Sequence, residues 1–230
     1  MRHREAEDAL ARNDRYVREA VEALNLCPFA ARARREETSA RRVLFGRLEQ
    51  VPQTTLLGIL SDMERAGGPE VVQLIFPDET DDPGDWERRA KAGLVAAHEA
   101  LGRSVAGVAA LHPRARFRET SARAMVPLFR RSPDPTLQWI SLAALERVRE
   151  GRPHGEVLLP RDPAEARALL ASLERPSLAD TIADTNRERA LSYGVEALEA
   201  LFESFARGEQ ALHCPGSAGT SQRGRDRQDR

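Results

Sequence analysis

The sequence predicts an α/β fold, with a mostly parallel or mixed sheet of three to four strands packed against helices. Two short apolar runs, EVVQLIF from Glu70 to Phe76 and SVAGVAALHP from Ser104 to Pro113, are typical of strands buried on both faces. Segments with helical periodicity lie before, between and after these runs. Because strands that alternate with helices of this length are joined by crossovers, we expect a layered α/β domain.

Helical periodicity predicts an N-terminal helix over Ala6 to Leu24, and Pro28 marks its end or a sharp turn just after it. An apolar run then predicts a strand, and two further periodic segments predict helices. These three elements span Arg41 to Leu48, Pro52 to Arg65, and Asp85 to Leu101.

The second half of the chain is less regular. After His112 a long connection is irregular or partly helical, and a fourth strand begins at Thr136, with a helix after it. One long helix is predicted from Leu178 to Phe205 to close the fold. We therefore expect a single domain over residues 1–207, in which residues 151–177 are an insertion, and a disordered polar tail over residues 208–230.

Composition limits the partners. The formal net charge is −1, so no overall positive field attracts nucleic acid or an acidic membrane. Two cysteines are too few for a disulfide framework, and no apolar stretch is long enough for a secretory signal or a membrane span. We expect a cytoplasmic protein with reduced thiols, and neither nucleic acid nor membrane as a partner.

Cys27 lies in LNLCPFA, at the end of the first helix, and has two interpretations. If Pro28 begins a second helix, the thiol is at the N-cap of that helix, where the helix dipole favours a thiolate. Cysteine is also among the most buried residue types, which favours a role in the core. The sequence leaves both interpretations open.

His112 ends a buried strand, at the edge of the sheet where open α/β folds bind ligands. A histidine there acts as an acid, a base or a metal ligand, or else as a structural hydrogen-bonding group. Several arginines follow it, and guanidinium groups suit carboxylates and phosphates, although clustered arginines are also typical of a solvated surface. The candidates for anion binding are Arg118, Arg130, Arg131 and Ser132.

The acidic loop from Asp78 to Asp85 lacks the fixed spacing of a calcium loop and is predicted to be solvated. No metal site is predicted from it.

Four motifs follow one another along the chain: LNLCPFA from Leu24, HPRARF from His112, RRSPDPTLQWI from Arg130, and NRERALSYG from Asn186. Together they resemble the motifs of a bacterial family, domain of unknown function 1415, whose activity its name leaves open. The resemblance implies that Cys27, His112, Arg131, Ser132 and Asn186 belong to one recurring constellation.

Three positions depart from the motifs of that family. Ala115 replaces a tyrosine, Arg130 an asparagine and Gln138 a histidine. The chain therefore resembles a divergent member.

The leading functional hypothesis is a pocket for a small anionic metabolite in a thiol-dependent enzyme. Cys27 is the expected nucleophile or redox thiol and His112 its base, and the anion is held by Arg118, Arg130, Arg131, Ser132 and Asn186. Two alternatives stay open. One is a non-catalytic protein that binds haem, a metal or another small ligand, and the other is an interaction scaffold with a buried thiol. The sequence identifies neither a cofactor nor an oligomeric state.

Overall fold

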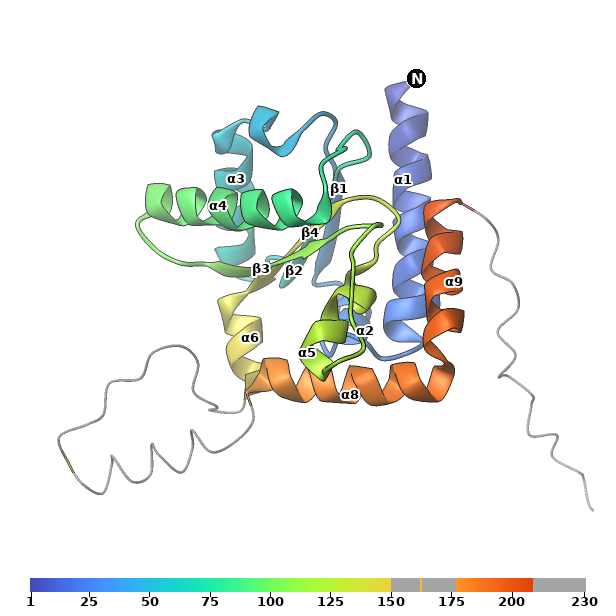
Figure 1. Ribbon diagram of the computed structural model, residues 1–230. Coiled ribbons are helices and arrows are strands. Elements are labelled where there is room, and N and C mark those ends of the chain that lie inside the picture. The colour runs from blue at the N-terminus through green and yellow to red at the C-terminus, as the bar shows by residue number, and fades with distance from the viewer. Residues whose placement is uncertain (150–161, 163–176, 209–230) are drawn as a thin grey trace, which may run out of the picture.

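Four strands form the sheet, in the order β1-β2-β4-β3 (Figure 1). The strands β1 and β2 are parallel, whereas β4 is antiparallel to both of its neighbours. The sheet is therefore mixed, because β4 is inserted between two strands that run in the same direction. The strands span Ser39–Val43 (β1), Val71–Ile75 (β2), Ala106–Leu111 (β3) and Thr136–Ser141 (β4).

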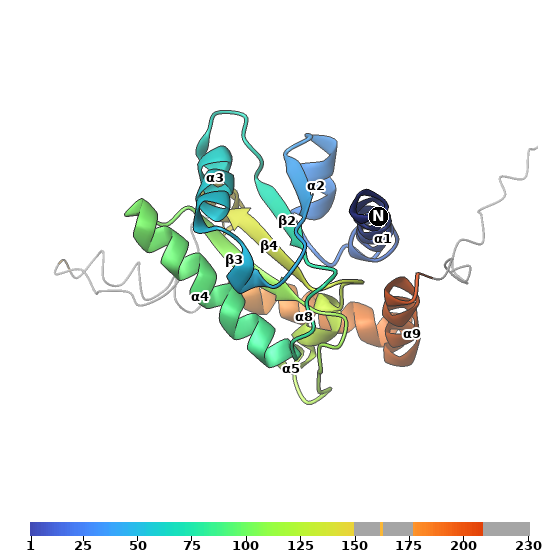
Figure 2. The ribbon, with the colours of Figure 1, turned by 90° about the horizontal axis from the view of Figure 1, so that it is seen from above.

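The computed structural model describes residues 1–149, 162 and 177–208, and helices cover both faces of its sheet (Figure 2). Two helices, α3 (Gln53–Glu64) and α4 (Pro83–Leu101), pack on one face. The other face is covered by α1 (Arg2–Tyr16), α2 (Ala30–Arg35), α6 (Leu142–Arg149), α8 (Leu178–Tyr193) and α9 (Val195–Ala206).

The α3/α4 face holds the largest apolar core. All five residues of β2 are buried, as the apolar run predicts. Trp86 of α4 is fully buried, its indole Nε1 donates to the Leu111 carbonyl oxygen at 3.0 Å, and its ring meets that of Phe76 edge-on at 5.3 Å. The indole thus fixes α4 against the end of β3 through both packing and a hydrogen bond.

The single C-terminal helix predicted from Leu178 to Phe205 is wrong. The chain breaks at Gly194, which has φ = +95°, a conformation that residues with a Cβ rarely adopt. As a result α9 turns away from α8 and lies beside α1 (Figure 1). The partly helical connection after His112 is confirmed as α5 (Ala122–Met125) and η3 (Val126–Arg130).

Two predictions lie mostly outside the described residues: the insertion at 151–177 and the disordered tail at 208–230. Within the described part of the chain, no helix is long and apolar enough to cross a membrane.

Candidate functional site

The chain reaches Cys27 through an unusual helix. After Tyr16, α1 widens into a π-helix, η1 (Val17–Glu22), and the Leu26 N–H donates to the carbonyl of Val21, five residues earlier. π-Helical turns are rare and occur often at functional sites. Asn25 then adopts φ = +49° and ends the helix, so that the backbone reverses just before the thiol.

Cys27 precedes the short helix α2, whose N-cap residue is Phe29 and which has no side-chain cap. The backbone N–H of Ala30 donates to the Cys27 carbonyl oxygen at 3.3 Å, and the backbone N–H groups of Phe29 and Ala30 also act as hydrogen-bond donors on the pKa of the thiol. The side chain of Gln138 on β4 also bonds to this sulfur. Burial is the largest influence and raises the pKa of the Cys27 thiol above its ordinary value, although all three hydrogen bonds act to lower it. The interpretation of Cys27 as the N-cap of a second helix is therefore wrong, because α2 begins at Ala30 with Phe29 as its N-cap, and burial keeps the thiol protonated at neutral pH.

Cys27 lines a cavity of about 440 Å³ between the sheet, η1 and α8. Most of its wall is apolar. Tyr16 contributes a phenol whose pKa burial raises, and its hydroxyl donates to the Phe129 carbonyl at 3.5 Å. The polar side chains in the wall, besides those of Tyr16 and Cys27, belong to Arg123, Arg130, Gln138 and Asn186.

His112 lines a different cavity, of about 540 Å³, beside the start of α4. The Arg114 backbone N–H donates to Nδ1 at 3.0 Å, which leaves the ring proton on Nε2, 3.0 Å from the Asp81 carbonyl oxygen. Burial, with a smaller effect of the Arg114 charge, lowers the His112 pKa to about 4. Both ring nitrogens are therefore bound to backbone, and the neutral ring joins two loops.

The structure does not bring Cys27 and His112 together. Side chains on a strand alternate between the faces of a sheet. Leu111 packs with the residues around Cys27, whereas His112, the next residue, lines the cavity on the α4 side. Cys27 and His112 therefore line separate cavities on opposite faces of the sheet, and no hydrogen bond joins their side chains. Arg130 lines both cavities.

Two of the predicted anion-binding residues are engaged within the fold. Arg131 pairs with Glu199 at 2.9 Å, donates to the Ala115 carbonyl oxygen at 2.9 Å and lies over the ring of Phe117. Ser132 is 1% exposed and donates to the Asp134 carbonyl oxygen at 2.6 Å. These contacts hold the RRSPDP segment between β3, α9 and β4.

Asn186 braces the Cys27 segment from α8. Its Nδ2 donates to the Leu26 carbonyl oxygen at 3.0 Å, and its Oδ1 accepts from Arg189 at 3.3 Å. Arg189 also donates to the Asn25 carbonyl oxygen. Arg118 is exposed and lines neither of the two cavities. Of the predicted residues, the structure thus gathers Cys27, Asn186 and Arg130 at one cavity.

Gln138 is the contact of Cys27 that the sequence analysis missed. It also accepts from Gln73 of β2 at 3.3 Å, which fixes its amide next to the sulfur. An amide is not a recognisable catalytic group, so composition gave no reason to single it out. The one available signal was that Gln138 stands where the resembling family motif has a histidine.

The acidic loop is less solvated than predicted. The Glu79 carboxylate is fully buried, accepts backbone N–H groups of Leu48, Thr80 and Asp81, and pairs with Arg89 at 3.3 Å. In the described part of the chain, no three His, Cys, Asp or Glu side chains lie together in a group that could hold a metal ion.

Comparison with known proteins gives one match. A family model described as "Protein of unknown function (DUF1415)" matches residues 8–174, a range that includes Cys27, His112 and Arg130 and ends before Asn186. No curated protein and no solved structure matches the chain.

Proposed function

Because the chain belongs to the DUF1415 family, whose function is unknown, we propose a function from the Cys27 cavity itself: it binds a small molecule that has an apolar body and an anionic group. The observation that carries the proposal is the composition of its wall. Apolar side chains surround a thiol, two amides and two arginines, in a volume within the range of about 300–1,000 Å³ that is usual for ligand sites. The adjacent π-helix adds a second, independent indication.

Arg130 is the group best suited to bind the anion. Its side chain is 39% exposed, and its one carboxylate neighbour among the described residues, Glu87, lies at 3.8 Å. Arg123, the other arginine of the wall, is bound to Asp180 at 2.5 Å. A ligand carboxylate or phosphate at Arg130 would gain a charge-assisted hydrogen bond without displacing a close ion pair.

The His112 base is not part of this proposal. Its ring nitrogens are both occupied, and its cavity is separate from that of Cys27. Without a base, a protonated thiol in an apolar wall serves as a contact for the ligand, and binding rather than catalysis is the function best supported.

Alkylation of Cys27 tests the proposal. The full chain with Cys214→Ser has Cys27 as its only thiol, so its reaction with N-ethylmaleimide reports on the cavity. Decanoate at ten times its dissociation constant should slow the reaction about tenfold, because bound ligand covers the sulfur. Decanol, which lacks the charge, should protect less, and acetate, which lacks the apolar body, should not protect. Equal alkylation rates with and without decanoate would contradict the proposal.

Matched arginine variants locate the anion. Arg130→Gln should raise the dissociation constant of decanoate about tenfold, which corresponds to the loss of roughly 1.5 kcal/mol from one charged hydrogen bond. Arg116→Gln removes an arginine that lines only the other cavity and should leave decanoate binding unchanged. If both variants weaken binding equally, long-range charge explains the effect and Arg130 does not contact the ligand.

Thiol-dependent catalysis is a second candidate, favoured by the three hydrogen-bond donors that act to lower the pKa of the Cys27 thiol against the effect of burial. Its test replaces the amide partner by a base. Gln138→His should lower the pKa of the thiol and speed its alkylation at pH 7, about tenfold for each unit by which the pKa falls. Gln138→Asn, which keeps an amide, is the control. A folded Gln138→His protein that reacts no faster than Gln138→Asn would argue that this position does not activate the sulfur.

A further inference from the structure

The cavity on the α4 side of the sheet differs from the Cys27 cavity in its charge. Its volume is about 540 Å³, and it lies between the start of α4, the end of β3 and η3. Its apolar wall includes Trp86, Ala110 and Pro127. Four charged side chains complete it: Asp82, Glu87, Arg116 and Arg130.

Both acidic groups of this wall have other partners within the fold. The Asp82 carboxylate is the N-cap of α4 and accepts the backbone N–H groups of Gly84 at 2.8 Å and Asp85 at 3.1 Å. Glu87 pairs with Lys91 at 2.8 Å, and this contact lowers its pKa. Neither carboxylate is left to compensate an arginine fully.

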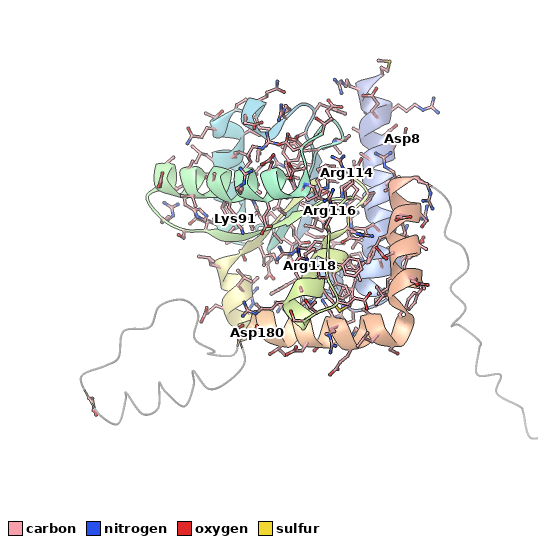
Figure 3. The ribbon with its side chains drawn as sticks, viewed as in Figure 1. Asp8, Lys91, Arg114, Arg116, Arg118 and Asp180 are labelled. Carbon is pink, nitrogen blue, oxygen red and sulfur yellow. The ribbon has the colours of Figure 1, made fainter. Side chains whose placement is uncertain are left out.

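The arginines around the cavity are, by contrast, largely uncompensated. Arg116 is exposed and has no hydrogen bond or ion pair to any side chain in residues 1–149, 162 and 177–208, whereas most arginines there pair with a carboxylate. Arg114 donates to the carbonyl oxygens of Thr80 and Asp81, which leaves its charge in place. Arg114, Arg116 and Arg118 follow one another along the loop that runs from β3 to α5 (Figure 3). Arg116 is therefore a charge of this wall that no carboxylate in the described part of the chain pairs with.

We propose that this second cavity binds the oxyanion group of a small molecule, a carboxylate or a phosphate, between Arg116 and Arg130. The two arginines line one cavity from different segments, and guanidinium groups suit the planar, two-oxygen edge of such a group. The volume exceeds what a bare ion needs, so the apolar wall at Trp86 and Pro127 holds the rest of the ligand. This site is independent of the thiol, and Arg130 is the residue that the two cavities share.

Calorimetric titration of the full chain tests the site, with sodium phosphate and sodium acetate as probes and sodium chloride as the reference salt. Phosphate or acetate should bind, and Arg116→Gln should weaken that binding about tenfold. Arg4→Gln is the matched control, because Arg4 is an exposed arginine of α1 that does not line this cavity and likewise has no side-chain partner among the described residues. Binding of phosphate alone assigns a phosphorylated ligand, and binding of acetate alone assigns a carboxylate.

Removing a negative charge from the wall distinguishes anion binding from a merely structural role of Arg116. Glu87→Gln removes a carboxylate from the wall and should tighten binding several-fold. Absence of binding for both probes, or equal binding by Arg116→Gln and Arg4→Gln, overturns the proposal. Cys27→Ser should leave phosphate or acetate binding unchanged, and Arg116→Gln should leave decanoate protection unchanged, so the two proposed sites fail or succeed separately.

Discussion

The two faces of the sheet use neighbouring residues of the same strands for different purposes. On β4, Leu137 and Trp139 are buried in the core under α3 and α4, whereas Gln138 and Ile140 line the Cys27 cavity under α8. Away from the cavity at the start of α4, the first face is closed by large side chains, whereas the second is held by helices that leave a space above Gln138 and Ile140. Alternation along a strand therefore lets one face supply stability while the other keeps polar groups in an apolar pocket.

The largest expected effect is on the closed face. Trp86→Ala should reduce the free energy of unfolding by about 3–5 kcal/mol, because it leaves a cavity and removes the hydrogen bond to the Leu111 carbonyl. Urea unfolding measures this loss. On the other face, Ile182→Val at the wall of the Cys27 cavity should cost about 1 kcal/mol or less. Equal losses in both variants would contradict the division between a closed face and an open one.

The same division explains what could be predicted from the sequence. The apolar runs of β2 and β3 predicted buried strands because burial on both faces leaves a local pattern. The insertion of β4 between β2 and β3 leaves no such pattern, since strand order depends on contacts between distant segments. Gly194 was visible, but a glycine within a periodic helix is often tolerated, so the break after Tyr193 was missed.

The candidate site was predicted in part for a similar reason. The Cys-Pro dipeptide indicated that a second helix could follow the thiol, because helix starts leave a local pattern, but that helix begins at Ala30 with Phe29 rather than Cys27 as its N-cap. Whether Cys27 and His112 lie on the same face of the sheet depends on two things: the face to which alternation along β3 directs His112, and the place where the end of η1 meets the sheet. Gln138 contacts the sulfur only through tertiary packing, and the periodicity of its own strand gave no indication of that contact.

The next effect concerns His112, whose neutral ring lies at the end of β3 on the α4 side. Its pKa falls from 6.5 to about 4, so the unfolded chain binds a proton that the folded chain does not over this interval. Stability is therefore complete above about pH 6.5 and is lost as the pH falls toward 4, by up to about 3 kcal/mol. Urea unfolding at a series of pH values measures the loss.

A residue-specific titration separates His112 from the carboxylates that also titrate in acid. The ring resonances of His112 should titrate near pH 4, and His112→Gln should flatten the fall in stability between pH 6.5 and 4. A midpoint near 6.5 for His112 would show that the ring is more solvated than its two backbone hydrogen bonds imply.

The last expected effect is on the open face, where Asn186 connects α8 to the Cys27 segment. Asn186→Ala leaves the Leu26 carbonyl without its donor and should reduce the free energy of unfolding by about 1–3 kcal/mol. Because the lost bond holds the turn before Cys27, alkylation of the thiol should also become faster. Ser192→Ala, an exposed change on the same helix, should alter neither quantity measurably. If Asn186→Ala destabilises the protein but leaves the alkylation rate unchanged, Asn186 supports the core as a whole, and the open face owes its cavity to helix packing alone.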